Sequence, residues 1–261
     1  MRLDVYLVTN GYTESRESAK RLIEAGEVTV DGVTVTRPST PVLGAPSVSL
    51  NEPRFVSRGG EKMEAALRLF GIDPTGLSVL DVGASTGGFT DCLLQWGAAS
   101  SVTVDAGTGQ LHPKLLRDPR VRNVEKYNAR ELSASDVGVF PLAVMDVSFI
   151  SQTYILPNIP ACLTEGGRLV SLIKPQFEAG RAALGKKGIV RAERDRALAI
   201  RRVLDMAVAV GLCPVGLAPS PILGGDGNEE FLALFVKGEG RGPLTDSMIE
   251  NTVKKKAVIL L

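Results

Sequence analysis

The chain of 261 residues contains a single histidine, His112, and only three cysteines, Cys92, Cys162 and Cys213. One histidine leaves no convincing Ser-His-acid triad and no histidine-rich metal cluster, so we expect neither triad hydrolysis nor metal-hydroxide chemistry. The cysteines are odd in number and far apart, which predicts neither a disulfide framework nor a Cys-x-x-Cys metal site. We therefore expect no bound metal and a reducing compartment, the cytoplasm.

Long uninterrupted hydrophobic runs are also scarce. No apolar signal core follows the start, Met1-Arg2-Leu3-Asp4, which predicts a protein that is not exported. The stretch 206–225 carries no charge, but prolines and glycines interrupt it. It therefore predicts a helix end, a short strand and a loop rather than a membrane span, and we expect no stable membrane association.

Positive and negative side chains nearly balance over the whole chain, with a net charge of +1, but the positive ones are unevenly distributed. Residues 181–202 hold eight basic and two acidic side chains, a net charge of +6, and residues 114–130 hold six and two, a net charge of +4. Local basic fields of this kind suit a polyanionic partner. The alternative for either segment is a solvated helix face with scattered charges.

Residues 1–53 predict a small α+β domain with its linker. The expected elements are helices near residues 3–10 and 15–25 and strands around residues 28–30 and 34–35. Ser15 is placed to cap the second helix, and Asp31-Gly32 predicts a two-residue hairpin turn between the strands. The proline- and glycine-containing stretch 41–53 marks the edge of this domain.

Residues 54–261 alternate between apolar strands and helical segments. The expected strands are 79–82, 101–105, 121–124, 142–146, 168–173, 214–218 and 230–236. Such alternation predicts an α/β fold with a mostly parallel, doubly wound sheet. A glycine-rich loop separates the last two strands, which favours an antiparallel hairpin at one edge of the sheet.

A glycine-rich turn joins a strand to a helix within residues 78–90. Gly83, Gly87 and Gly88 allow positive φ and a close approach of the backbone to a ligand. The spacing Asp-x-Gly-x-x-x-Gly-Gly differs from the Gly-x-Gly-x-x-Gly of dinucleotide sites. With Asp105 ending the next strand, the segment resembles the S-adenosylmethionine loop of Rossmann-like methyltransferases. The alternative is a tight turn without a ligand.

Charged residues recur where the predicted strands end, at the edge where open α/β sheets bind ligands. These residues are Asp81, Asp105, Asp146 and Lys174. Methylation of a ribose hydroxyl requires a base, because the hydroxyl does not ionise freely. A partly buried lysine beside another cation can serve, because burial and like charge both favour the neutral amine. The chain supplies two lysines and two acids suited to this chemistry: Lys62, Asp146, Lys174 and Glu230.

Three segments of the first domain, 2–4, 15–32 and 37–39, resemble the αL motif, a small RNA-binding module first described in a ribosomal protein of the small subunit. The resemblance covers nearly all of residues 1–50. It implies that a basic helix and a hairpin bind structured RNA. The residues expected to contact RNA are Arg2, Arg16, Lys20, Arg21 and, in the second domain, Arg58.

Four further segments, 57–62, 146–151, 173–178 and 227–231, resemble the signatures of the FtsJ-type ribose 2'-O-methyltransferases. They are most similar to the TlyA, or haemolysin-A-like, branch, and they span almost the whole chain in the same order. This resemblance implies an enzyme with S-adenosylmethionine as its cofactor. It also implies ribosomal RNA or ribosomal subunits as partners, with the 2'-hydroxyl of cytidine as the typical target.

The same resemblance implies roles for individual residues. Lys174 is the implied base, Asp146 orients it, and Lys62 and Glu230 position the ribose, although the neighbouring Glu229 leaves the choice of acid open. Gly83, Ser85 and Gly87 are expected at the methionine portion of the cofactor, Asp105 at its ribose hydroxyls and Asn128 at its adenine. The full set of expected cofactor contacts is Asp81, Gly83, Ala84, Ser85, Gly87, Phe89, Asp105, Asn128 and Asp146.

Three other functions compete with this interpretation. A haemolysin-like, membrane-active protein would need a spanning or pore-forming segment, which the sequence does not supply. Methylation of a base amino group would place the segment 146–149 in the role of an Asp/Asn-Pro-Pro-Tyr loop, but the segment lacks the prolines. An RNA-binding protein with a degenerate methyltransferase domain is the last alternative, and the intact set of two lysines and two acids argues against it.

Overall fold

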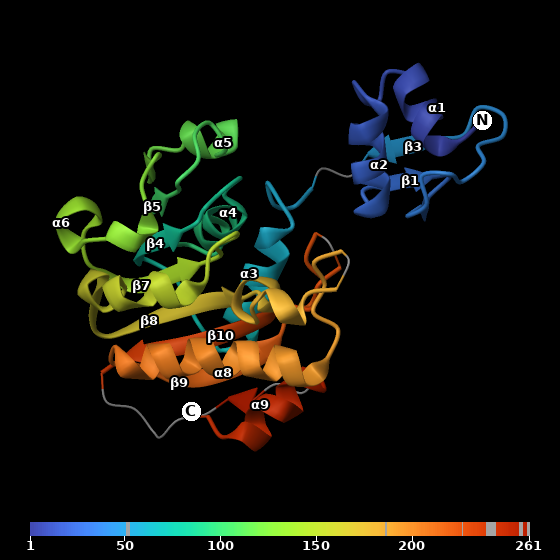
Figure 1. The fold of residues 1–261 in the computed structure, drawn as a ribbon. Helices are drawn as coiled ribbons and strands as arrows, with labels where there is room; N and C mark the ends of the chain where they lie inside the picture. The colour runs from blue at the N-terminus through green and yellow to red at the C-terminus, as the bar shows by residue number, and fades with distance from the viewer. Residues whose placement is uncertain (51–52, 186, 226, 239–243, 256–257, 260–261) are drawn as a thin grey trace. The chain divides into compact units, whose positions relative to one another are not determined.

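The computed structural model describes residues 1–50, 53–185, 187–225, 227–238, 244–255 and 258–259 (Figure 1). Contacts between residues divide the chain into two compact units, Met1–Arg54 and Phe55–Leu261. The first is drawn in blue at the N-terminal end of the colour scale. Each unit has its own hydrophobic core, and each is described separately below.

The N-terminal unit packs two helices against a small antiparallel sheet. Its elements are α1 (Leu3–Thr9), α2 (Arg16–Glu24), β1 (Val28–Val30), β2 (Val33–Thr34) and β3 (Val48–Leu50), with sheet order β2-β1-β3. Ser15 caps α2 by accepting a hydrogen bond from the Ser18 amide at 3.2 Å. Asp31 and Gly32 form the predicted turn, with φ values of 51° and 79°. Strand β3 was not predicted, because its residues lie in the stretch interpreted as the edge of the domain.

The second unit is built on an eight-stranded sheet in the order β11-β9-β10-β8-β7-β4-β5-β6. Its strands are β4 (Ser78–Val82), β5 (Ser100–Val104), β6 (Val121–Val124), β7 (Phe140–Met145), β8 (Leu163–Ile173), β9 (Leu212–Pro219), β10 (Phe231–Lys237) and β11 (Val258–Ile259). Neighbours from β6 to β8 are parallel, and β10 runs antiparallel to both β8 and β9. The predicted α/β sheet is confirmed, and the strand beyond the β9–β10 pair, β11, was not predicted.

Helices cover both faces of this sheet. The α-helices are α3 (Gly59–Leu69), α4 (Gly88–Gln95), α5 (Pro113–Leu116), α6 (Ala134–Val137), α7 (Pro175–Glu178), α8 (Glu193–Ala209) and α9 (Asp246–Val253). Short 3-10 helices lie at η1 (Ala129–Glu131), η2 (Gln152–Tyr154), η3 (Leu156–Asn158), η4 (Pro160–Cys162) and η5 (Arg181–Ala183). Among the described residues, none of the helices has the length and apolar character needed to cross a membrane. The uncharged stretch 206–225 holds the end of α8 and then β9, as predicted.

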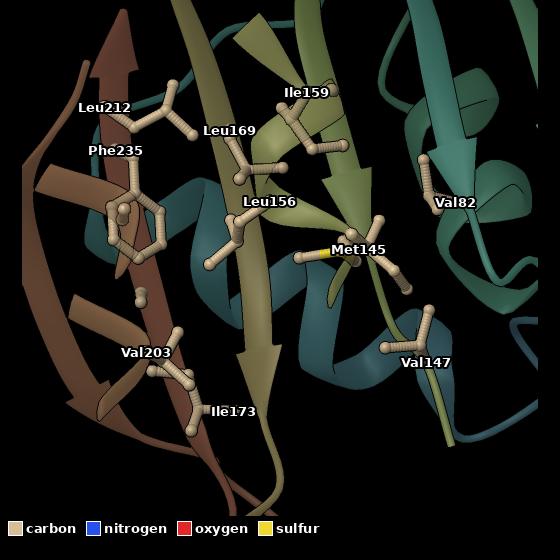
Figure 2. Close-up of a cluster of buried hydrophobic side chains, with 14 of the residues drawn as sticks. Val82, Met145, Val147, Leu156, Ile159, Leu169, Ile173, Val203, Leu212 and Phe235 are labelled. Carbon is tan, nitrogen blue, oxygen red and sulfur yellow. The ribbon is translucent and has the colours of Figure 1, made fainter. Parts of the chain in front are cut away.

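Side chains of the central strands alternate between two cores, which is the pattern of a sheet buried on both faces. In β7, Ala143 and Met145 belong to one core and Leu142 and Val144 to the other. Figure 2 shows the first core, where Met145 of β7 and Phe235 of β10 lie on the same face as Val203 of α8. The second core packs under α3 and α4. Because the central strands are packed on both faces, the sheet fixes the positions of the residues at its edge.

Candidate active site

Strand topology brings three charged residues to one edge of the sheet. Asp146 directly follows β7 and Lys174 directly follows β8, and these strands are parallel neighbours, so both residues leave the same edge. Glu230 precedes β10, which runs antiparallel to β8 with Phe231 opposite Ile173. The start of an antiparallel strand meets the end of its neighbour, and Glu230 therefore reaches this edge as well.

Two buried ion pairs form there. Lys174 Nζ lies 2.6 Å from Asp146 Oδ1 and donates a hydrogen bond to Ser148 Oγ at 2.8 Å. Lys62, from the first turns of α3, donates from Nζ to Glu230 Oε2 at 2.5 Å. The two lysines and Glu230 are each less than a tenth exposed. The four residues predicted to act together are therefore brought together in two pairs, and of the four only Asp146 is partly exposed, at 21% of its side chain.

The choice between the two adjacent glutamates follows from their partners. Glu230 binds Lys62, whereas Glu229 Oε2 lies 3.4 Å from Arg196 Nε and its Oε1 lies 3.9 Å from Lys255 Nζ. Successive residues in an extended chain point in opposite directions, so only one of the two can face α3. Glu230 is the one that does.

A cavity of about 210 Å³ opens beside these pairs. Its walls come from the start of α3, the glycine turn after β4 and the first residues of α4. The predicted residues that line it are Arg58, Lys62, Asp81, Gly83, Ala84, Ser85, Phe89 and Asp146, together with Ser57, Gly59, Thr86 and Gly88. Because Lys62 and Asp146 each belong to one of the ion pairs, the cavity lies against both.

The glycines of the turn combine the predicted positive φ with close packing against protein. Gly83 has φ of 81°, and a Cβ there would lie 2.8 Å from the Asp146 carbonyl oxygen. Gly87 has φ of 92°, and a Cβ there would overlap the side chains of Leu111 and Leu115. Gly83 lines the cavity, but its missing side chain leaves room for the backbone that carries Asp146. The sequence had predicted the need for glycine but not this reason.

Asp81 lines the cavity, and one of its two carboxyl oxygens has no hydrogen-bond partner among the described residues. Its carboxyl group is fully buried, and Oδ2 accepts hydrogen bonds from the Thr90 amide at 3.1 Å and the Thr90 hydroxyl at 2.7 Å. Oδ1 has no hydrogen-bond partner among the described residues. Burial raises the pKa of Asp81 to about 7, against the lowering effect of the Thr90 hydrogen bonds. A buried carboxyl with a free oxygen is suited to a cationic or hydrogen-bond-donating ligand.

Two predicted cofactor residues have their side chains engaged elsewhere. Asp105 accepts hydrogen bonds from the amides of Ser85 at 2.8 Å and Gly107 at 2.7 Å, so it shapes the turn that lines the cavity. Asn128 accepts from the Arg130 amide at 3.1 Å and donates to Glu131, and it caps η1. Neither Asp105 nor Asn128 is among the lining residues. Their roles toward a cofactor stay predictions.

Ser148, Gln152 and Glu178 belong to this region but were given no role by the sequence. Ser148 accepts the hydrogen bond from Lys174, and its position in the Asp-Val-Ser segment next to Asp146 was the available signal. Gln152 and Glu178 are each 1% exposed, and the Gln152 amide donates a hydrogen bond to the Glu178 carboxylate. Their contact joins residues far apart in the sequence, which no local pattern reveals.

Two of the arginines expected to bind RNA are paired within the N-terminal unit. Arg2 Nε and Arg16 Nη2 each lie 2.9 Å from a carboxylate oxygen of Asp4. Hydrogen bonds from Arg2 hold the pKa of the buried Asp4 at about 2. Both guanidinium groups remain about half exposed, whereas Lys20 and Arg21 are exposed on α2 and have no ion pair among the described residues. The last two are the cations with most freedom to bind phosphate.

Part of the basic charge in segments 114–130 and 181–202 is used inside the second unit. Arg196 is buried and donates to the carbonyl oxygens of Val190 and Arg191. Arg202 donates to a backbone carbonyl, Arg201 pairs with Asp246, Lys114 pairs with Asp91, and Arg120 pairs with Asp118. Lys186 lies outside the described residues. These segments therefore combine structural cations with exposed ones, and a polyanionic partner for the exposed ones stays a prediction.

A doubly wound α/β sheet with a glycine turn after its first strand, and with charged residues at the carboxyl edge, defines a protein of the Rossmann-like class with a ligand site at that edge. Comparison with known families agrees. Residues 55–237 match the FtsJ-like methyltransferase family, and residues 1–45 match the S4 domain. The chain belongs to the FtsJ-like methyltransferase family.

Named relatives cover nearly the whole chain. The 16S/23S rRNA (cytidine-2'-O)-methyltransferase TlyA of Mycobacterium tuberculosis is 38% identical over 258 residues, which cover 97% of this chain and 96% of that protein. Hemolysin A of Brachyspira hyodysenteriae is 41% identical over 239 residues, covering 90% of this chain and 100% of that protein. A solved structure of a candidate hemolysin from Streptococcus thermophilus has a TM-score of 0.77 at 41% identity, covering 97% of this chain and 94% of that one.

Proposed function

We propose that this protein transfers the methyl group of S-adenosylmethionine to a ribose 2'-hydroxyl of ribosomal RNA, with cytidine as the target nucleoside. The observation that carries the proposal is the buried Lys174–Asp146 pair, 2.6 Å apart beside a cavity that Asp146 also lines. The name of the mycobacterial relative supports the substrate, and the S4 domain supports an RNA partner. Because ribosomal RNA is the proposed substrate, we place the protein in the cytoplasm.

Lys174 is proposed as the base: its Nζ atom, in the neutral amine form, takes the proton from the 2'-hydroxyl and becomes an ammonium group paired with Asp146. The Asp146 carboxylate at 2.6 Å and the Ser148 hydroxyl at 2.8 Å fix the direction of the amine. Lys62 and Glu230 form the opposite pair, and they are proposed to hold the ribose so that its oxygen faces the methyl donor. Burial of Lys62, Lys174 and Glu230 limits the access of water, which would compete for the amine.

The cavity residues fit the cofactor on a structural ground. Asp81 lines the cavity together with Gly83, Ala84, Ser85 and Phe89, and its unpartnered Oδ1 suits the ammonium group of the methionine portion. When bound, S-adenosylmethionine supplies an electrophilic methyl group on its sulfonium. Arg58 is exposed on the wall of the same cavity, and we propose that it meets the RNA phosphate nearest the target ribose.

Cofactor affinity is expected to fall at acidic pH because of Asp81. Its pKa is about 7 in the free protein, and a bound ammonium favours the ionised carboxylate. Below pH 7 binding must therefore displace a proton, and Kd should rise by up to about tenfold per pH unit, whereas it should level off as the pH rises above 7. Calorimetry between pH 5.5 and 7.5 measures this dependence. Asp81→Asn should bind the cofactor more weakly, and its Kd should not change with pH. If the Kd of that variant keeps the same pH dependence, another group is responsible for it.

RNA binding is expected to weaken steeply with salt through Lys20 and Arg21. Replacing both by alanine should lower the slope of log K against log salt concentration by about 2, because each phosphate contact contributes about 1. Filter binding with ribosomal RNA at several salt concentrations measures the slope. Arg68→Ala is the matched control, because Arg68 is exposed but already paired with Glu64 at 3.0 Å. Equal slopes for the double variant and the unaltered protein would remove α2 from the RNA interface.

The competing functions fit the residues less well. Base amino-methylation would leave the buried Lys62–Glu230 and Lys174–Asp146 pairs without a task. Removing charged groups from water costs free energy. A protein that only binds RNA would gain nothing from placing these four charged groups in a largely buried cluster. No described feature favours a membrane-active function as a second candidate.

Transfer of a labelled methyl group from S-adenosylmethionine to purified ribosomal RNA tests the proposal. A 2'-O-methyl group prevents alkaline cleavage at its nucleotide, because the 2'-oxygen is the internal nucleophile of that reaction. We expect the label in alkali-resistant dinucleotides. Label recovered only in mononucleotides would indicate base methylation and would contradict the proposal.

A further inference from the structure

One more buried carboxyl group, that of Glu178, lies near the two ion pairs but belongs to neither. Glu178, the last residue of α7, is 1% exposed. Its Oε1 accepts a hydrogen bond from the Gln152 amide at 2.8 Å, and its Oε2 accepts one from the Ser151 hydroxyl at 2.5 Å. Burial raises the pKa of this carboxyl group, and the same hydrogen bonds oppose that effect. Both oxygens are thus committed to one short segment.

Gln152 continues the connection into the sheet. Its side chain is also 1% exposed, and Nε2 donates to the Leu172 carbonyl oxygen at 2.6 Å. The Ser171 hydroxyl donates to Gln152 Oε1 at 2.7 Å. Glu178 and Gln152 therefore form a continuous chain of buried hydrogen bonds, which we call the Glu178–Gln152 bridge.

The bridge joins the two halves of the proposed catalytic pair. Ser151 and Gln152 end the loop that starts at Asp146, whereas Ser171 and Leu172 lie just before Lys174 and Glu178 lies just after it. The segment carrying the amine is thus tied on both flanks to the segment carrying the carboxylate. Buried polar groups cost free energy unless every hydrogen bond is satisfied, and an apolar core would hold the strand equally well.

Two hydrogen bonds anchor the loop after Asp146, one from Lys174 to Ser148 and one from Ser151 to Glu178, and the loop between these anchors holds a residue in an unfavourable backbone conformation. Phe149 has φ of 65°, a left-handed value that is rare for an aromatic residue. Such a conformation persists only where the surroundings fix it. Ser148 is held by Lys174 on one side, and Ser151 is held by Glu178 on the other. Loss of the second anchor would allow the loop, and Asp146 with it, to relax.

We propose that Glu178 and Gln152 are positioning residues for the methyl transfer, which fix the Asp146 loop against the segment of Lys174. The proposal rests on the function proposed above. Neither residue lines the cavity, so the bridge acts through the ion pair and not on a ligand. A displacement of about 1 Å between reacting groups can cost 100-fold in rate, and this is the size of effect that a lost bridge should produce.

Glu178→Ala is expected to lower the single-turnover rate of RNA methylation by about 10- to 100-fold. The Kd for RNA should stay within about twofold, since the N-terminal unit is untouched. The Kd for S-adenosylmethionine should rise by less than the rate falls, since Asp146 is one of several residues that line the cavity. Glu178→Gln keeps an acceptor for the Gln152 amide and should recover part of the rate. Thr252→Val is the control: it deletes one buried hydrogen bond, from the Thr252 hydroxyl to the Met248 carbonyl oxygen on α9, and should lower the melting temperature without lowering the rate.

A double-variant cycle separates positioning from general destabilisation. In an Asp146→Asn background, Glu178→Ala should cause little further loss of rate, because its effect passes through Asp146. If the fold-losses of the two single variants instead multiply in the double variant, or if Glu178→Ala alone has a normal rate, the inference is overturned. Should Glu178→Ala fail to fold, Ser151→Ala leaves Glu178 in place and removes the bond to its Oε2, together with the Ser151 contacts to Thr153. This variant is expected to lose about tenfold in rate, with a normal rate counting against the bridge. If the unaltered protein leaves RNA unmethylated, the proposed function itself fails, which is a distinguishable result.

Discussion

Replacing Lys174 by alanine is expected to lower methyl transfer to RNA by about 10²- to 10⁴-fold, the usual contribution of a general base. Affinity for S-adenosylmethionine should be unchanged, because Lys174 does not line the cavity. Lys174→Arg should fail as well, since a guanidinium group does not release its proton at any working pH. Single-turnover rates with saturating RNA and cofactor measure the chemical step without product release.

The control for this experiment is a lysine at the other end of the same sheet. Lys237 ends β10 and is partly buried, with its Nζ 2.8 Å from Glu165 Oε1. Lys237→Ala should change the rate by less than about twofold, because an ion pair of this kind contributes little even to stability. A near-normal rate for Lys174→Arg would mean that the side chain serves as a cation, and the assignment of Lys174 as the base would be wrong.

Gly83→Val is expected to weaken cofactor binding by about 100-fold or more, which corresponds to about 3 kcal/mol. A side chain at this position would press on the Asp146 carbonyl oxygen and on Val147, and the backbone there already has a left-handed φ. Both walls of the cavity would shift, since Gly83 and Asp146 line it together. Calorimetric titration with S-adenosylmethionine gives the affinity.

Gly76→Val separates the clash from the backbone strain. Gly76 has φ of 73°, close to that of Gly83, but a Cβ there would meet no atom within 4 Å. This variant should lose stability and keep its cofactor affinity. Equal affinities for the Gly83 variant and the unaltered protein would contradict the placement of the cofactor at this turn.

The positions of Asp146 and Lys174 could be predicted because each directly follows an apolar run that forms a buried strand. Strands β7 and β8 end within one residue of the predicted limits, so the residues after them fall at the carboxyl edge, although β8 begins five residues earlier than predicted. Resemblance to a known family added Lys62 and Glu230. The choice of Glu230 over Glu229 needed the pairing of β10 with β8, because two adjacent acids give the same signal in a sequence.

Side-chain partners that are distant in the sequence could not be predicted. The bond between Glu178 and the segment at Ser151 joins neighbouring loops of a sheet, and no helical or strand period encodes it. Asp4 has the same character: its carboxylate pairs with both Arg2 and Arg16, which the sequence treats as free cations. Strand β3 is short and lies after several prolines and glycines, so its pairing with β1 depends on the tertiary contacts of the domain.

We propose that the buried Lys174 drives methylation of a ribose in ribosomal RNA. Mapping of 2'-O-methyl groups across ribosomal RNA from cells with this protein, without it, and with only its Lys174→Ala variant tests this proposal. We predict one or a few modified cytidines that are present with the unaltered protein and absent in the other two cells. Identical maps in all three cells, or full modification by the Lys174→Ala variant, would contradict the account.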